Sequence, residues 1–224
     1  MDERNRALEP ATDEELRQIT IGEPALLNGP ITLADYDPQW PVLFSIEAAK
    51  IKGALGDTAV LIEQVGSTSV PGLCAKPIID ILLVVPDSAD ESTYVPQLEA
   101  AGYVLRIREP EWEEHRLFRG TDPALNLHVF SPGSKEIVRM QLMRDWMRAH
   151  PEDRDLYAST KRALAAQEWK YVQNYADAKT TVIEEIMTRA QANKAGVVSY
   201  LLGRRPAPPH TGYPMRRYAA NPEK

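Results

Sequence analysis

The sequence of 224 residues contains one cysteine, Cys74, and four histidines. A single cysteine excludes an internal disulfide framework and a zinc site built from four thiolates. The histidines also lack the H-x-x-x-H and H-E-x-x-H spacings that many zinc sites use. No apolar stretch approaches the roughly 18 residues that a membrane span needs, and the polar start shows no apolar signal-peptide core. We therefore expect a cytoplasmic protein without a membrane partner.

Positive charge is also scarce, because 26 Lys and Arg residues stand against 32 Asp and Glu residues, a formal net charge of -6. General nucleic-acid-binding surfaces usually appear as basic stripes, so we do not expect nucleic acid as a partner. A local basic pocket is compatible with this balance. The hydrophobic share of 43% is typical of a globular protein that buries a core.

The composition divides the chain into three parts. We expect an N-terminal arm over residues 1–29, one folded domain over residues 30–195 and a flexible tail over residues 196–224. Residues 204–224 hold five prolines and five Lys or Arg residues, a composition that cannot build a core.

Hydrophobic periodicity predicts an α+β fold. Apolar residues at positions 44, 48, 51 and 55 recur at helical spacing before Gly56, and Thr12 begins a possible short capped helix. We expect strands over residues 59–65, 78–85, 103–107, 115–120 and 124–130, and a helix over residues 90–103. Long helices are predicted over residues 135–150, 152–167 and 171–191. The result is a mixed sheet with flanking helices and a helical C-terminal half.

One acidic residue, Asp80, interrupts a strand that is otherwise apolar on both faces. Burying a carboxylate costs several kcal/mol unless it is paired, hydrogen-bonded or bound to a metal. A structural ion pair with Lys76 or an arginine is one explanation. The other is Mg²⁺ with the phosphates of a ligand, because this hard cation is held by carboxylate, phosphate and water oxygens.

A turn-rich segment, "GSTSVPGLCAKP", precedes this strand and begins with Gly66 and Ser67. Glycine lets the backbone approach a phosphate, while the following amides and hydroxyls donate to its oxygens. The segment has neither the P-loop spacing nor the dinucleotide-binding spacing. We expect phosphate binding here, although a Gly-Ser turn without a ligand is common.

Five segments in the order "YDPQWPVLF", "VGSTSVPGLCAKPIIDILLVV", "LHVF", "LMRDWMRAHPEDRDLYASTKRALA" and "YADAK" resemble the GrpB family. The resemblance implies a nucleotidyltransferase-like mixed sheet, and the chain is also similar to the GrpB-like domain fused to some dephospho-CoA kinases. Gly66 and Ser67 match the phosphate loop of that superfamily, and Asp80 matches its first metal-binding Asp. The second Asp is replaced by Leu82.

Candidate site residues follow from these patterns and from the resemblance. The expected catalytic residues are Asp80, His128 and Lys76, with Asp80 as the metal ligand. The expected ligand- or phosphate-binding residues are Gly66, Ser67, Thr68, Ser69, Arg116, Arg144, Lys161, Tyr175 and Lys179. Asn126 and His128 should share one face of a strand, and Arg116 should point to the side of His128. Lys161, Lys179 and Arg144 should form a cationic wall, unless they are a solvated helix surface.

Two hypotheses about function remain open at this point. The first is a nucleotidyltransferase-type enzyme that uses Mg²⁺ and a nucleoside triphosphate or another phosphate-bearing substrate, for nucleotidyl transfer or for carboxylate activation before ligation. The second is a non-catalytic module that binds a nucleotide, coenzyme or phosphorylated metabolite. Leu82 favours the second hypothesis, whereas Asp80, Lys76 and His128 favour the first. The oligomeric state is left open.

Overall fold

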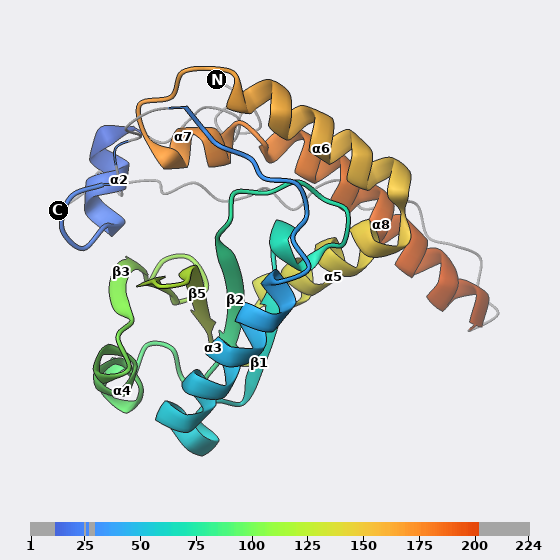
Figure 1. Cartoon of the computed structure of the whole chain (residues 1–224). Helices are drawn as coiled ribbons and strands as arrows, with labels where there is room; N and C mark the ends of the chain where they lie inside the picture. Colours follow the sequence, from blue (N-terminus) through green and yellow to red (C-terminus); the bar gives the residue numbers. More distant parts are fainter. Residues whose placement is uncertain (1–11, 25, 27–29, 202–224) are drawn as a thin grey trace, which may run out of the picture.

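The computed structural model describes residues 12–24, 26 and 30–201. A five-stranded sheet has the order β1-β2-β5-β4-β3 (Figure 1). The strands are β1 (Leu61–Val65), β2 (Ile79–Val84), β3 (Val104–Glu109), β4 (His115–Thr121) and β5 (Ala124–Phe130). β2 and β5 pair in parallel, and the other neighbours pair antiparallel. This mixed sheet with its helices confirms the predicted α+β fold.

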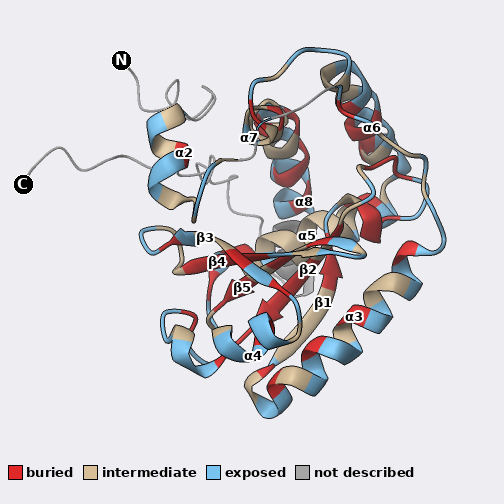
Figure 2. Cartoon of the chain, turned by 60° about the vertical axis from the view of Figure 1, so that its left-hand side comes forward, coloured by how far each residue is buried: buried red, intermediate tan, exposed pale blue. Residues whose placement is uncertain are grey.

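Helices α3 (Trp40–Leu55) and α4 (Val95–Ala100) cover one face of the sheet (Figure 2). Alternate residues of the central strands, among them Ile81 and Leu127, are fully buried against Ile51 of α3 and Leu98 of α4. Gly56 ends α3 with a φ of 52°, a backbone angle that glycine adopts without strain.

Four helices lie on the opposite face: α5 (Lys135–Ala149), α6 (Pro151–Ala165), α7 (Val172–Asp177) and α8 (Thr180–Leu201) (Figure 2). Leu82, Val84 and Phe130 of the sheet pack with Ile137 and Met140 of α5. The sequence predicted one helix over residues 171–191, whereas the chain forms α7 and α8 with Lys179 between them.

The loop between β1 and β2 joins the sheet to this helical half. It begins with a short 3₁₀ turn, η2 (Ser67–Ser69). Val70, Leu73 and Cys74 of the loop are buried in a second core, where they meet Tyr157 of α6 and Ile186 of α8. The loop that precedes Asp80 is therefore fixed by the sheet at its ends and by α6 and α8 along its length.

A short helix, α2 (Asp13–Ile19), confirms the capped helix predicted from Thr12, and its cap is a capping box in which the side chains of Thr12 and Glu15 cap each other's backbone. The following segment docks on β3, since the Ile21 N–H donates to the Arg106 carbonyl at 2.8 Å. The remainder of the predicted arm lies largely outside the described residues.

Helix α8 extends to Leu201, into the segment predicted as a tail, and residues 202–224 lie outside the described residues. Within the described ranges, every helix is too short or too polar to cross a bilayer.

Candidate functional site

Asp80 stands in a row of residues that crosses three neighbouring strands on the face covered by the helical half. Asp80 of β2 pairs with Asn126 of β5, and Asn126 pairs with Arg119 of β4. Side chains of directly paired residues point to the same face of a sheet. The strand register therefore brings an acid, an amide and a guanidinium side by side.

The turn that holds Gly66 lies directly against Asp80. Gly66 has a φ of 67°, and a Cβ on this residue would lie 2.3 Å from Asp80 Oδ2. Glycine is required for both reasons, since only glycine adopts this angle freely and leaves room for the carboxylate. The Gly-Ser turn and Asp80 are therefore in direct contact.

The Asp80 carboxylate is hydrogen-bonded rather than ion-paired to a lysine or arginine. Asn126 Nδ2 donates to Asp80 Oδ1 at 2.8 Å, and His128 Nε2 lies 3.8 Å from the same oxygen. Within the described part of the chain, no Lys or Arg side chain forms an ion pair with this carboxylate. The structural ion pair with Lys76 is thus not formed.

Three lysines from separate elements surround Asp80, and we call them the lysine cluster: Lys76, Lys161 and Lys179. Lys76 lies in the loop before β2, Lys161 on α6 and Lys179 between α7 and α8. The Asp80 charge favours the protonated form of each of them. One carboxylate is thus surrounded by three potential cations.

Lys161 is buried, with 2% of its surface exposed. Its Nζ donates to Ser67 Oγ at 3.0 Å and to the carbonyl of Cys74. These bonds attach α6 to the phosphate-loop candidate, so a ligand held by Ser67 would also contact Lys161.

The other two lysines share an aromatic platform. The ammonium groups of Lys76 and Lys179 lie 5.5 and 4.7 Å from the centre of the Tyr175 ring. Tyr175 is 1% exposed, and its hydroxyl has no hydrogen-bond partner among the described residues. The same holds for the Oγ1 of Thr68, which is equally buried. Buried polar groups usually find partners, so these two hydroxyls are exceptions to the usual satisfaction of buried polar atoms.

Burial shifts the titration of the lysine cluster toward neutral pH. It lowers the pKa of Lys161 to about 7 and the pKa of Lys76 to about 8, and it also lowers the pKa of Lys179. Repulsion between Lys76 and Lys179 adds to the shift of Lys76. A bound anion would restore the charged form of these groups.

Two further residues extend the site along the same face of the sheet. His115 Nε2 lies 3.1 Å from His128 Nδ1, and His115 Nδ1 lies 2.5 Å from Glu109 Oε2. The sequence analysis missed both His115 and Glu109. The alternation of His115, Leu117 and Arg119 along the strand was the available signal, because it places His115 on the Arg119 face.

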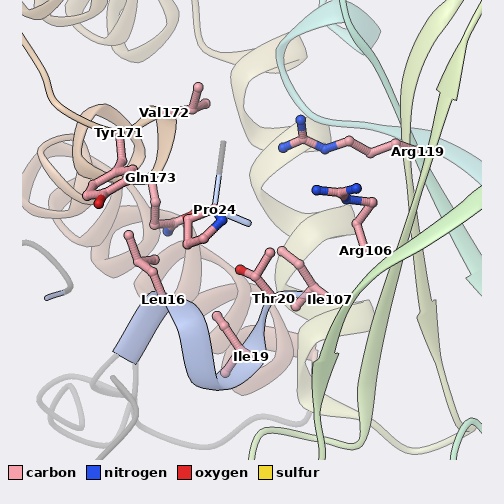
Figure 3. Close-up of a pocket in the computed structure, with 10 residues that line it drawn as sticks. All are labelled: Leu16, Ile19, Thr20, Pro24, Arg106, Ile107, Arg119, Tyr171, Val172 and Gln173. Carbon is pink, nitrogen blue, oxygen red and sulfur yellow. The ribbon is translucent and has the colours of Figure 1, made fainter. Parts of the chain in front are cut away.

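A pocket of about 60 Å³ lies where α2, strands β3 and β4 and the start of α7 meet (Figure 3). Arg106 and Arg119 project into it from the strands, opposite Leu16 and Val172 (Figure 3). The register shift between Leu105 and Ile107 explains why Arg106 and Ile107 both line this pocket. Arg119 also acts on Lys76 by charge repulsion, so it is the pocket residue that interacts with the lysine cluster.

Several predicted residues thus converge: Gly66, Ser67, Thr68, Lys76, Asp80, His128, Lys161, Tyr175 and Lys179. Ser69 has a structural part, since its hydroxyl donates to the Gly66 carbonyl and its own carbonyl accepts from Arg148.

Arg116 and Arg144 do not join this group. Arg116 pairs in the sheet with Val129, on the face opposite His128, and its Nε donates to Glu91 at 2.6 Å. The expectation that Arg116 points to the side of His128 is therefore wrong, because the register shifts it by one position. Arg144 donates to Glu63 at 2.7 Å and to Asp145, which occupies its guanidinium away from the lysine cluster.

The side chains around Asp80 do not provide the oxygen ligands that a bound Mg²⁺ would need. Mg²⁺ prefers several oxygen ligands, and at Asp80 the neighbouring Asn126 presents its NH₂ group to the carboxylate. Among the described residues, no group of three His, Cys, Asp or Glu side chains could hold a metal ion. The position two residues after Asp80 is filled by buried Leu82. Binding of Mg²⁺ at Asp80 stays a prediction.

A protein-family match and a solved structure both support the α+β fold of this chain. The family described as GrpB protein matches residues 30–189. The chain belongs to the GrpB family. A UPF0157 protein of Halalkalibacterium halodurans is 62% identical to this GrpB protein over 183 residues, which cover 82% of this chain and 94% of the relative.

More distant relatives include a solved structure and an enzyme. The crystal structure of GrpB from Enterococcus faecalis has a TM-score of 0.65 and 28% identity, and the match covers 73% of this chain and 99% of that chain. A dephospho-CoA kinase of Mycolicibacterium paratuberculosis is 28% identical over 165 residues, which cover 62% of this chain and 40% of the kinase.

Proposed function

We propose that this GrpB protein binds a phosphate-bearing small molecule, a nucleotide or a phosphorylated metabolite, over Asp80. The observation that carries the proposal is the convergence of Lys76, Lys161 and Lys179 near Asp80, whose charge acts on all three lysines, while Asp177 also acts on Lys179. Phosphate groups neutralise such an excess of positive charge and accept hydrogen bonds from several donors at once.

The Gly66 turn would bind the phosphate on the side of the sheet. The lysine cluster would contact the same phosphate from the helical half. The buried hydroxyls of Thr68 and Tyr175 are two further donors without partners among the described residues. The pocket bordered by Arg119 is the space for the remainder of the ligand (Figure 3).

We further propose that the protein is a cytoplasmic transferase-type enzyme, which uses this site for nucleotidyl transfer or for carboxylate activation. His128 beside Asp80 supports a reaction, because a histidine next to a phosphate site can move a proton. The name of the dephospho-CoA kinase relative is compatible with a nucleotide or coenzyme as the ligand.

A non-catalytic binding module is the alternative, favoured by the presence of one carboxylate where the superfamily resemblance implies more. The enzyme and the binding module would bind the same class of ligand, but only the enzyme would convert it to a product. Incubation with ATP and Mg²⁺, followed by ³¹P NMR, separates them, since only an enzyme releases pyrophosphate or phosphate.

Binding is tested first by thermal shift with ATP, dephospho-coenzyme A, pyrophosphate and amino acids, each with and without Mg²⁺. A ligand that binds the folded state raises the melting temperature. Lys161→Gln and Lys179→Gln should each weaken binding by about tenfold, since a hydrogen bond to a charged group contributes about 1.5–3 kcal/mol.

Lys50→Gln is the matched control, because Lys50 also lies over a tyrosine ring, 4.7 Å from the centre of Tyr103, on the opposite side of the sheet. Equal weakening by the control and the site variants, or no shift with any probe, would overturn the proposed site.

A further inference from the structure

Four titratable side chains form a continuous line across the sheet, one from each of four neighbouring strands. Glu109 lies on β3, His115 on β4, His128 on β5 and Asp80 on β2. The successive distances are 2.5 Å from Glu109 Oε2 to His115 Nδ1, 3.1 Å from His115 Nε2 to His128 Nδ1 and 3.8 Å from His128 Nε2 to Asp80 Oδ1.

The line runs from the protein interior to the candidate site. The side chains of Glu109 and His115 are 9% and 4% exposed, whereas those of His128 and Asp80 are 20% and 27% exposed. His128 and Asp80 therefore form the more accessible end of the line, and His115 and Glu109 form its buried end.

Aromatic packing fixes the inner ring. His115 is stacked on Phe130, with ring centres 4.7 Å apart, and it meets the edge of Trp112 at 5.1 Å. Burial lowers the pKa of His115, which favours its neutral form. A neutral, immobile imidazole has one donor nitrogen and one acceptor nitrogen, so each neighbour in the line determines the next.

The direction of the hydrogen bonds is assigned from Glu109 at the buried end, because a carboxylate accepts hydrogen bonds and has none to donate. Glu109 accepts a hydrogen bond, so the proton of His115 lies on Nδ1 and its Nε2 is an acceptor. His128 must then donate from Nδ1, which leaves the lone pair of its Nε2 exposed beside Asp80. The Ser-His-Asp triad uses the same principle to orient its histidine.

We propose that His128 is the general base of the site and that His115 and Glu109 are its positioning residues. The substrate side of this inference rests on the proposed function, whereas the histidine geometry does not. His128 Nε2 accepts the proton of a substrate hydroxyl, whose O–H electron pair forms the bond to the phosphorus held by the lysine cluster. The leaving phosphate or pyrophosphate departs with the electron pair of the broken P–O bond.

The proton positions can be measured by long-range ¹H–¹⁵N NMR on the histidine rings of the full chain at pH 8. We expect His115 and His128 both protonated on Nδ1. Glu109→Gln should move part of both populations to Nε2, because an amide can donate to His115 Nδ1 where the carboxylate only accepts. A neutral His128 protonated on Nε2 in the unmodified protein would overturn the assignment.

Two controls accompany this measurement. His150, whose Nδ1 lies 2.9 Å from the Trp146 carbonyl at the α5–α6 junction, should keep its tautomer in every variant. Glu111→Gln, at an exposed acid near Glu109, should leave His128 unchanged. If Glu109→Gln does not fold, His115→Phe, which keeps a ring of similar size, tests the same loss of tautomer control at His128.

Reactivity supplies a second readout that a merely structural role would not change. Diethyl pyrocarbonate reacts with the lone pair of an imidazole, and its attachment to His128 can be followed by mass spectrometry with His150 as the reference. Glu109→Gln should slow the reaction at His128 in proportion to the fraction of His128 that NMR shows to have moved to the Nε2-protonated tautomer. An unchanged rate would remove Glu109 from its positioning role.

The two proposals fail separately. Correct tautomers without any binding of pyrophosphate or ATP would leave the histidine line intact and overturn the proposed ligand. Binding of these probes by a protein whose His128 is protonated on Nε2 would support the proposed ligand and overturn the role of His128 as the general base.

Discussion

Gly66 faces the carboxylate of Asp80 so closely that a Cβ on residue 66 would lie 2.3 Å from Asp80 Oδ2. The turn and the acid are therefore one unit, and the shape of the phosphate-loop candidate depends on both residues. This relationship gives the first prediction.

Gly66→Ala should lower the free energy of unfolding by about 1–3 kcal/mol from backbone strain alone, because the φ of 67° is unfavourable for alanine. The contact with Asp80 should add to this loss. Gly53→Ala is the matched control, since a Cβ there meets nothing within 4 Å and the site is in helix α3. It should stabilise the protein by about 0.5–1 kcal/mol in urea unfolding. Equal effects of the two variants would contradict the close approach.

Asp80→Asn should change the free energy of unfolding by less than about 1 kcal/mol, because the carboxylate is partly exposed and has no Lys or Arg ion pair among the described residues. The same change should alter the thermal shift that ATP produces, because it removes the carboxylate over which the ligand is proposed to bind. The contrasting variant is Asp153→Asn, at a buried acid that accepts from Trp146 and Arg189. It should cost about 1–3 kcal/mol. A strongly destabilised Asp80→Asn protein that still binds ATP would make Asp80 a structural residue.

Sulfate should bind more weakly as the pH rises, since it keeps its charge while the lysine cluster loses protons. The pKa of Lys161 is lowered to about 7 and the pKa of Lys76 to about 8, so the charged forms that bind an anion are depleted above these values. We expect the Kd to increase by about tenfold or more from pH 6 to pH 9, with proton uptake on binding near neutral pH. Calorimetry in two buffers measures both quantities. Lys161→Gln should flatten the pH profile, and a pH-independent Kd would refute the assignment.

Glu91→Gln should destabilise the protein by about 1–3 kcal/mol without changing the binding of pyrophosphate. Glu91 accepts from Arg116 at 2.6 Å and from Arg108 at 2.7 Å, and its loss leaves the buried Arg116 with the more distant carboxylate of Glu114, at 3.4 Å. These residues lie on the face of the sheet away from the lysine cluster. Urea unfolding and a pyrophosphate thermal shift test the two halves of the prediction, and weaker pyrophosphate binding would place Arg116 in the site after all.

Arg119→Gln should weaken the binding of pyrophosphate more than the binding of sulfate. Arg119 stands beyond Asn126 in the row that begins at Asp80, so it reaches a second phosphate better than the first. Arg108→Gln is the matched control on the neighbouring strand, because Arg108 pairs with Arg116 on the opposite face. Identical losses for both anions would exclude a role for Arg119 in extended ligands.

The sequence by itself determined the local structure and the position of the unusual acid, Asp80, within an apolar strand. Short apolar or alternating runs predicted the five strands, Thr12 predicted the capped helix, and Asp80 within an apolar strand indicated a site. These features depend on neighbours within a few residues, where side-chain period and capping are set by the backbone geometry.

Only the tertiary structure decided which charged groups meet. Strand register placed Arg119 beside Asn126 and turned Arg116 to the other face, and it aligned Glu109, His115 and His128 across the sheet. Register is set by the burial of whole strand faces, and a shift of one residue reverses every side chain, so no local pattern fixes it. The convergence of Lys76, Lys161 and Lys179 likewise arises from packing between the sheet and the helical half, which joins segments distant in the chain.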